Sequence, residues 1–287
     1  MPQIYAVANQ KGGVAKTSTA CNLAYGLSQK LMRNGAPTGS VLLVDIDPQG
    51  NVADFFGLRQ QVYDPNRNPD GPCISKLLTG NATLKQSILS ADRPEDGVHR
   101  PNLFIIPASL ELEYAAEELL INDFVGARRG NRKAVSLNDI FNHYLAEAKR
   151  VFDFIIIDCP PKLDTLKVPI YRFAESIIVP VKTDHISVVG AVQHTQDIAE
   201  LRRAGEITAQ VAYIVPTMHD GRQVLARQML ASLQNTYGAQ RVIAPIPNSV
   251  KVKESPAAGG LSVFEYAANS DPARAYQNLV EVIYGEQ

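Results

Sequence analysis

The sequence predicts an α/β protein with a mainly parallel central β-sheet and helices on both faces. A short apolar run at 4–8 precedes a glycine-rich loop and a helical pattern. Two later apolar runs, within 40–51 and 151–161, end in aspartate and are typical of parallel strands buried on both faces. Helical patterns separate the strands along the chain, which favours one parallel sheet covered on both faces.

The first helix is expected directly after the loop 9–18. Gly35 is placed to end it. Its apolar residues recur at the spacing of an amphipathic helix: Ala20, Leu23, Ala24, Leu27 and Leu31.

The loop itself has the chemistry of a phosphate-binding site. A strand, a glycine loop and a helix turn backbone N–H groups and the positive end of the helix toward an anion. Lys16 supplies charge to terminal phosphates, and the Thr17 hydroxyl can bind Mg²⁺. In the common pattern a glycine precedes this lysine, whereas here Ala15 does, and a second lysine stands at the front of the loop. The predicted nucleotide-binding residues of the loop are Lys11, Gly12, Gly13, Val14, Ala15, Lys16, Thr17 and Ser18.

Further along the chain, strands are expected at 102–107, 176–181, 210–216 and 241–246, and helices at 110–120, 136–150, 188–203, 223–237 and 272–284. Residues 59–72, rich in proline, asparagine and aspartate, are predicted to be a surface insertion. Residues 122–135, with three arginines and a lysine, are predicted to be a basic loop and a second insertion. No repeat or break indicates a second domain, so we expect one domain over 1–287.

Acidic residues follow two of the strands that should neighbour the phosphate loop. Asp45 and Asp47 follow the second strand, and Asp158 ends the run at 151–158. Ligands in an open α/β sheet lie at the carboxyl ends of the strands. The sequence therefore predicts three carboxylates and two lysines around one site.

Composition limits the classes of function. With 45% hydrophobic residues, 20% charged residues and a net charge of −1, the chain is typical of a globular protein with no global field toward nucleic acid or acidic lipid. Three cysteines without metal spacing suit a reducing cytoplasm, and no signal peptide or membrane span is expected.

The motifs resemble those of the ParA family of deviant Walker-type P-loop ATPases. The phosphate loop matches the family's Walker A loop, 41–51 its Walker A′ segment and 152–161 its Walker B segment. The similarity continues through 105–109, 179–181 with Gly190, 217–222 and 246–256. The resemblance implies a P-loop NTPase fold of the short ParA type, which has no N-terminal helix-turn-helix domain.

The resemblance also implies roles for these residues in hydrolysing ATP with Mg²⁺. Lys16 would hold the β- and γ-phosphates, and Asp47 would position the attacking water. Lys11 would cross to the nucleotide of the partner subunit in an ATP-dependent homodimer. The metal side would consist of Thr17, Asp158 and Asp45. Adenine contacts are expected from Met218, Pro247, Asn248 and Val250.

Members of this length usually bind double-stranded DNA without sequence preference as ATP dimers. A ParB-like adaptor then stimulates hydrolysis, so the protein would be cytoplasmic and nucleoid-associated. The candidate DNA-binding residues are Arg222, Arg227, Arg241, Lys251 and Lys253, and the last two share a face if 248–253 is extended. Asn248 stands where many members have arginine.

Three alternatives remain open from the sequence alone. A MinD-like membrane ATPase would need a basic amphipathic tail, whereas residues 281–287 are acidic and lack lysine. A ParA-like positioner of a protein cargo, such as carboxysomes, would share the same ATPase. A nitrogenase-reductase-like electron carrier would need cysteines that bridge two subunits, and Cys159 is the best-placed of the three.

Overall fold

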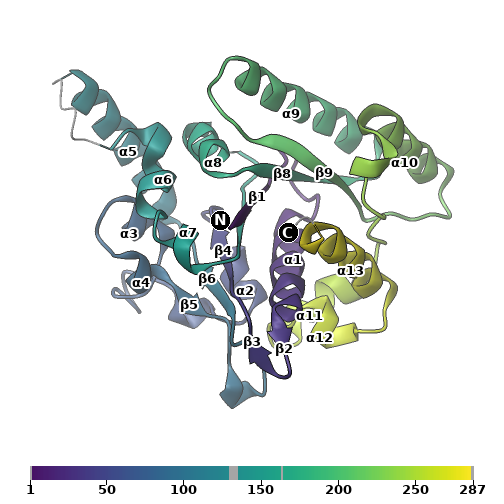
Figure 1. Ribbon diagram of the computed structural model, residues 1–287, viewed down its shortest axis with the longest axis horizontal. Helices are drawn as coiled ribbons and strands as arrows, with labels where there is room; N and C mark the ends of the chain where they lie inside the picture. The colour runs from purple at the N-terminus through teal and green to yellow at the C-terminus, as the bar shows by residue number, and fades with distance from the viewer. Residues whose placement is uncertain (1, 129–134, 163, 286–287) are drawn as a thin grey trace.

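The structure, a computed structural model, describes residues 2–128, 135–162 and 164–285 (Figure 1). Its centre is a seven-stranded sheet in the order β5–β6–β4–β7–β1–β8–β9. All neighbouring strands are parallel except β5, which is antiparallel to β6. The strands of this sheet are β1 (Gln3–Val7), β4 (Val41–Asp45), β5 (Leu89–Ser90), β6 (Leu103–Ile106), β7 (Phe154–Asp158), β8 (Ser176–Lys182) and β9 (Gln210–Thr217).

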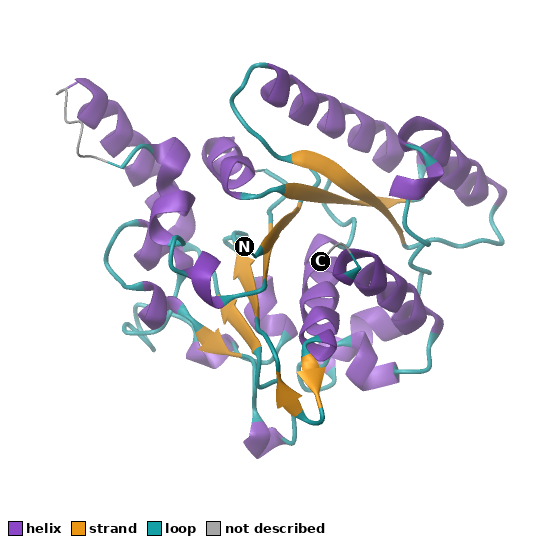
Figure 2. Ribbon diagram, viewed as in Figure 1, coloured by secondary structure: helices purple, strands orange, loops and turns teal. Residues whose placement is uncertain are grey.

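Helices cover both faces of the sheet, which confirms the predicted fold class (Figure 2). Along β1, Ile4 and Ala6 belong to one buried cluster and Tyr5 and Val7 to the other, because successive side chains of a strand point to opposite faces. The first cluster includes residues of α3 (Ile74–Leu78), α5 (Glu111–Arg128), α6 (Ile140–Tyr144), α7 (Ala148–Val151), α8 (Lys167–Phe173), α9 (His185–Arg203) and α10 (Val224–Tyr237). The second includes residues of α1 (Lys16–Lys30), α2 (Asn51–Phe55), α12 (Val263–Ala267) and α13 (Asp271–Tyr284).

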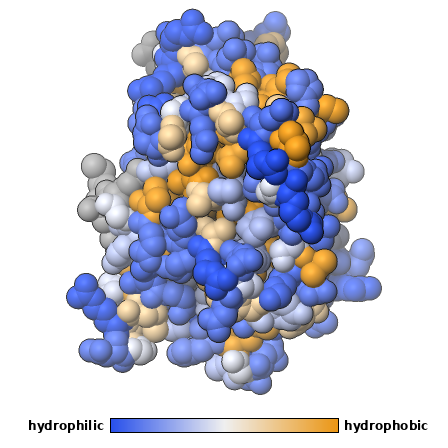
Figure 3. All heavy atoms as spheres, turned by 90° about the vertical axis from the view of Figure 1, so that its right-hand side faces the viewer, coloured by the Kyte–Doolittle hydropathy of each residue, from blue (hydrophilic) through white to orange (hydrophobic). Residues whose placement is uncertain are grey.

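Two further helices, α4 (Leu84–Ser87) and α11 (Val250–Ala257), complete the described set. Every helix in the described part of the chain is too short or too polar to cross a membrane. The face seen in Figure 3, on the side of α10 and α13, is mostly hydrophilic, and its apolar residues lie mainly in the upper half.

Gly35 does not end the first helix, contrary to the sequence expectation. Helix α1 ends at Lys30, and a small hairpin of β2 (Met32–Arg33) and β3 (Ala36–Pro37) follows. Asn34 and Gly35 form its two-residue turn with φ of 51° and 79°. Both values are left-handed, as a type I′ hairpin turn requires, and Asn-Gly is the dipeptide that favours it.

Three other segments differ from the expected elements. The apolar run 241–246 is not a strand, because only Val242 forms a bridge, to Ile214. Residues 136–150 do not form one helix but a short 3-10 turn (Leu137–Asp139), α6 and α7. Helix α5 continues to Arg128, so 122–128 is helical rather than part of a loop, and 129–134 lies outside the described residues.

Candidate functional site

The register of the sheet brings three strand ends together. Val7 of β1 and Asp45 of β4 both pair with Asp158 of β7, so the two aspartates lie at the same level as the last residue of β1, which leads into the phosphate loop. The predicted convergence at the carboxyl edge of the sheet is therefore present in the fold. A nucleotide placed here would meet the glycine loop and two strand-end carboxylates.

The phosphate loop leads into an N-terminus of α1 that no side chain caps. Gly13 and Ala15 adopt left-handed φ of 70° and 64°, which bends the loop over the helix N-terminus. Ala15 is the N-cap residue, and no side chain caps the helix. The first turn of α1 also lacks an acidic residue. Its N–H groups and the positive end of its dipole are thus available to an anion.

Two buried side chains hold the loop in place, and sequence reasoning missed both. The Asn9 amide donates to the carbonyl of Pro180 on β8 (2.8 Å) and accepts from the backbone N–H of Lys11 (2.9 Å). The Thr217 hydroxyl, at the end of β9, donates to the carbonyl of Val14 (3.1 Å). The bonds to Pro180 and Val14 join residues far apart in the chain, so only their positions at strand ends could have indicated them.

Lys16 lies inside the site rather than on its surface. Its ammonium donates to the carbonyl of Lys11 across the loop (3.0 Å). Burial lowers the pKa of Lys16, while the carboxylates of Asp158 and Asp47 act in the opposite direction. Phosphate oxygens next to this ammonium would favour its charged form further.

Asp158 is the carboxylate whose surroundings best fit a metal. It is fully buried, and neither of its oxygens makes a hydrogen bond to the described residues. Burial raises its pKa to about 7, although the nearby Thr17 hydroxyl acts to lower it. A buried carboxylate whose oxygens accept no hydrogen bond is costly unless a cation or donor completes the site.

The donor set at this edge fits Mg²⁺. This ion takes oxygen ligands and usually keeps several waters beside one or two carboxylates and substrate phosphates. Thr17 and Asp158 are of that type, and in the described residues no cluster of three or more His, Cys, Asp or Glu side chains replaces them. Asp45 is less available to a metal than Asp158, because its two oxygens already accept hydrogen bonds from the N–H groups of Asp47 (2.9 Å) and Val52 (3.1 Å). Burial raises the pKa of Asp45 as well.

Asp47 faces a cleft of about 720 Å³ beside the loop. Gln10 and Gly12 of the phosphate loop line it, together with Glu113 and Glu117 of α5 and the segment Pro160–Lys162. The exposed side chain of Lys11 instead lines a cavity of about 500 Å³ on the side of α9 and α10, with Ile186 and Leu225. Asp47 and Lys11, the two predicted catalytic residues outside α1, thus line two different cavities next to the phosphate loop.

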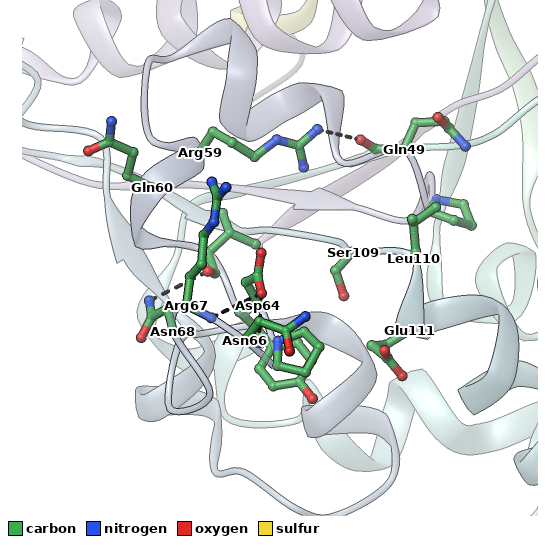
Figure 4. A pocket seen from close by; sticks show the side chains of 14 residues that line it. Gln49, Arg59, Gln60, Asp64, Asn66, Arg67, Asn68, Ser109, Leu110 and Glu111 are labelled. Carbon is green, nitrogen blue, oxygen red and sulfur yellow. Dashed lines mark hydrogen bonds between the residues drawn. The ribbon is translucent and has the colours of Figure 1, made fainter.

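A larger cavity, of about 790 Å³, lies beside the site without including the phosphate loop (Figure 4). The segment 59–68, the turn at Pro48 and Gln49 and the start of α5 line it. Arg59 donates to the carbonyl of Gln49 (2.8 Å) and pairs with both oxygens of Asp54 (2.8 Å each). The first residue of the predicted insertion therefore fixes the loop that carries Asp47, a role that sequence reasoning did not assign.

The predicted adenine contacts come from two loops that lie side by side. The N–H of His219 donates to the carbonyl of Ile246, and the N–H of Asn248 donates back to the carbonyl of His219 (3.0 Å each). These bonds place Met218 beside Pro247 and Asn248. Val250 begins α11 directly after them.

The structure groups four of the five candidate DNA-binding residues and separates the fifth. Arg227 donates to the carbonyls of Gly221 and Arg222 (2.7 and 3.1 Å), and this turn adjoins the loop that leads to Lys251. Arg222 is exposed and pairs with Asp220, which lowers the pKa of that carboxyl. Arg241 lies beyond the far end of α10, about 20 Å away at 1.5 Å per helical residue.

Lys251 and Lys253 do not share a face, contrary to the expectation for an extended segment. They belong to helix α11, whose N-cap Ser249 accepts from the N–H of Lys251 (3.3 Å). Side chains two residues apart on a helix point about 160° away from each other. Both remain exposed.

The three cysteines are buried and form no disulfide, and Cys159 is 1% exposed. Burial raises the pKa of Cys159. A buried neutral thiol is poorly placed to ligate a cluster shared between two subunits.

Comparison with known proteins gives one consistent picture. A family model described as an AAA domain matches residues 2–211. The chromosome-partitioning ATPase Soj of Thermus thermophilus is 32% identical over 280 residues, 97% of this chain and 94% of that protein. The chromosome partitioning protein ParA of Caulobacter vibrioides is 30% identical over 286 residues, 99% and 95% of the two chains. The structure of apo McdA from Cyanothece has a TM-score of 0.78 at 21% identity, covers 99% and 100% of the chains, and shows the shared fold.

Proposed function

Because this chain belongs to the ParA family of P-loop ATPases, we propose that it is a partition ATPase that positions plasmid or chromosomal DNA. It hydrolyses ATP with Mg²⁺ as cofactor. In the ATP state it forms a homodimer that binds double-stranded DNA without sequence preference. A ParB-like adaptor stimulates hydrolysis and so releases the dimer. Because the dimer binds DNA, the protein is cytoplasmic and nucleoid-associated.

Within one subunit, the residues divide the work of phosphoryl transfer, which depends on positioning and charge neutralisation. Lys16 and the N–H groups at the start of α1 bind the β- and γ-phosphates. Asp47 orients the attacking water from the edge of the cleft. Thr17 and Asp158 hold Mg²⁺, with Asp45 fixing the Asp47 turn behind them. When bound, Mg²⁺ neutralises charge on the phosphate oxygens.

The observation that carries the dimer is the position of Lys11. Its backbone is held on both sides, by Asn9 and by the Lys16 ammonium, while its side chain is exposed and has no ion pair within the described residues. Ile186 and Leu225, which line the same cavity, are 67% and 49% exposed. Polar residues, among them Lys182 and Asp184, line the rest of the cavity. A fixed cation without an ion pair, beside exposed apolar side chains, suits a surface that a second subunit covers.

The dimer is conditional on nucleotide for an electrostatic reason. Two triphosphates that face each other repel, and unit charges 4 Å apart interact by about 4 kcal/mol at an effective dielectric constant of ~20. A lysine from each subunit offsets that repulsion only when nucleotide is present. Dimerisation is then linked to the bound nucleotide.

The two lysines separate binding from dimerisation. We expect Lys16→Ala to abolish binding of a fluorescent ATP analogue, and Lys11→Ala to retain binding but remain monomeric by light scattering with a non-hydrolysable analogue and Mg²⁺. Lys85→Ala, an exposed lysine on α4, is the matched control and should behave as wild type. A nucleotide-dependent dimer of Lys11→Ala would refute the cross-subunit role.

A further inference from the structure

Helix α5 is apolar on its outer side as well as its inner side. Its inner side, with Leu112 and Ala115, belongs to the core. On its outer side, Tyr114, Ile121 and Phe124 are 69%, 61% and 59% exposed. The name α5 stripe is used here for six exposed apolar residues on or next to this helix: Leu110, Tyr114, Leu120, Ile121, Phe124 and Val125.

The stripe is one continuous surface rather than scattered residues. At 100° per residue, Tyr114, Ile121 and Val125 lie within about 40° of one another around the helix. Phe124 lies beside them, and Leu110 directly precedes the first turn. In the described part of the chain, six of thirteen exposed large hydrophobic residues belong to this stripe. Single exposed apolar residues are ordinary, but a contiguous group of this size marks an interaction site. Figure 1 shows α5 at the edge of the molecule, extending away from the sheet.

The charges around the stripe define the occupant. Glu113 and Glu118 flank it and Glu117 lies within it, all three exposed and without an ion pair among the described residues. The one basic residue of the helix is Arg128, at its C-terminal end, where its guanidinium lies over the Phe124 ring (4.8 Å). A second copy of α5 would bring the same carboxylates into contact, and an anionic lipid surface would be repelled as well. A positively charged partner would pair with them.

We propose that the α5 stripe is the docking surface for a basic amphipathic helix of a second protein. Such a helix places apolar anchors at i, i+4 and i+7 against the stripe and lysines or arginines against the flanking glutamates. The surface is where the adaptor would bind, and to that extent the inference rests on the proposed function. Glu113 and Glu117 also line the cleft that holds Asp47, so the docked helix lies beside the turn that positions water.

The test uses the full-length protein and a synthetic helical peptide. The peptide, about 20 residues long, carries leucines at i, i+4, i+7 and i+11 and lysines elsewhere; a matched peptide has glutamate at every lysine position. By fluorescence anisotropy we expect the basic peptide to bind at least about tenfold more tightly than the acidic one. The triple variant Tyr114→Ser, Ile121→Ser, Phe124→Ser should lose at least about tenfold for the basic peptide, an effect the size of a small cluster of interface contacts.

Two further variants separate the stripe from general stickiness. A second triple variant, with Glu113→Gln, Glu117→Gln and Glu118→Gln, keeps the apolar surface. It should bind the basic peptide more weakly than wild type, and its affinity should depend less on salt concentration. Val151→Ser with Tyr266→Ser removes exposed apolar residues elsewhere and should bind as wild type. All variants should keep the thermal unfolding midpoint, because the altered side chains face solvent.

Three results would overturn the proposal. One is equal binding of both peptides, or of the stripe variant and wild type. Another is a nucleotide-free dimer in analytical ultracentrifugation that the stripe variant abolishes, which would assign the surface to a second copy. The third is flotation of wild type, but not the variant, with phosphatidylglycerol vesicles. The readout here is peptide binding. Absence of ATP turnover or of ATP-dependent dimerisation would therefore contradict the proposed function but would leave this inference unaffected.

Discussion

Ala15 places a left-handed backbone at a non-glycine residue in the centre of the phosphate loop. Its φ of 64° and ψ of 35° are those at which a Cβ approaches its own backbone. The common phosphate loop has glycine at this position, which avoids the cost. The strain is held by neighbours, since Asn9 and Thr217 fix the loop on either side.

Ala15→Gly should therefore stabilise the nucleotide-free protein slightly. Removing the Cβ relieves about 1 kcal/mol of strain, and the greater freedom of glycine in the unfolded chain opposes this by a few tenths or more. We expect the free energy of unfolding in urea to rise by less than about 1 kcal/mol. Ala20→Gly, in the regular part of α1, should lower it by about 1 kcal/mol or more. Equal losses in both variants would mean that Ala15 is unstrained.

His194 makes stability depend on pH. It is buried on α9 with the Tyr171 hydroxyl 3.5 Å from its ring, and burial, aided by Lys167, lowers its pKa to about 4. In the unfolded chain its pKa is about 6.5. Between these values the unfolded state binds the proton and the folded state does not, so stability is full above pH 6.5 and falls as the pH drops toward 4.

His194→Gln should remove that dependence. At pH 5 the wild type should have lost about 2 kcal/mol through this group relative to pH 7, whereas the variant should lack this share of the loss. Denaturant unfolding of both proteins at pH 5, 6 and 7 isolates the effect, because the buried aspartates are common to both. Parallel pH profiles would show that His194 carries a proton in the folded state.

At the scale of elements, the sequence predicted long periodic segments well and short irregular ones poorly. The strand-end aspartates of β4 and β7 were found because buried parallel strands have a strong pattern. The run 241–246 is equally apolar, but only Val242 finds a strand partner, and pairing is a tertiary property. Asn9 and Thr217 were missed for the same reason. Ser249 is different: an N-cap residue before α11 was a local indication that Lys251 and Lys253 lie on a helix.

The packing of α13 on α1 depends on one glycine. A Cβ at Gly26 would overlap the side chain of Val280. Gly26→Ala should lower the free energy of unfolding by about 1–2 kcal/mol, since overpacking at about 1–3 kcal/mol outweighs the gain in helix propensity. In the background Val280→Ala the same change should be neutral or stabilising. An unfolding double-mutant cycle measures this, and identical effects in both backgrounds would show that the helices are not in contact there.

At the scale of the whole molecule, the net charge of −1 gives a single subunit no general attraction to DNA. The proposed DNA binding would therefore have to come from a local group of cations. Arg222 and Arg227 lie at a turn next to the loop that leads into α11, whereas Arg241 lies beyond the far end of α10. An ATP dimer doubles the number of phosphate contacts without any new residue, so the dimer should bind far more tightly than the monomer.

Arg222→Ala and Arg241→Ala make the same change in charge at different places. They therefore test whether DNA binding depends on the local group of cations or on a general electrostatic attraction. Each phosphate contact contributes about 0.9 to the slope of log affinity against log salt, so losing one per subunit should flatten the slope of the dimer by about 2. We expect this for Arg222→Ala, and a slope within error of wild type for Arg241→Ala, by anisotropy of a labelled duplex with a non-hydrolysable ATP analogue. Arg222 must first leave Asp220, so Asp220→Ala should strengthen binding. Equal losses in the two arginine variants would indicate a diffuse electrostatic attraction rather than one surface.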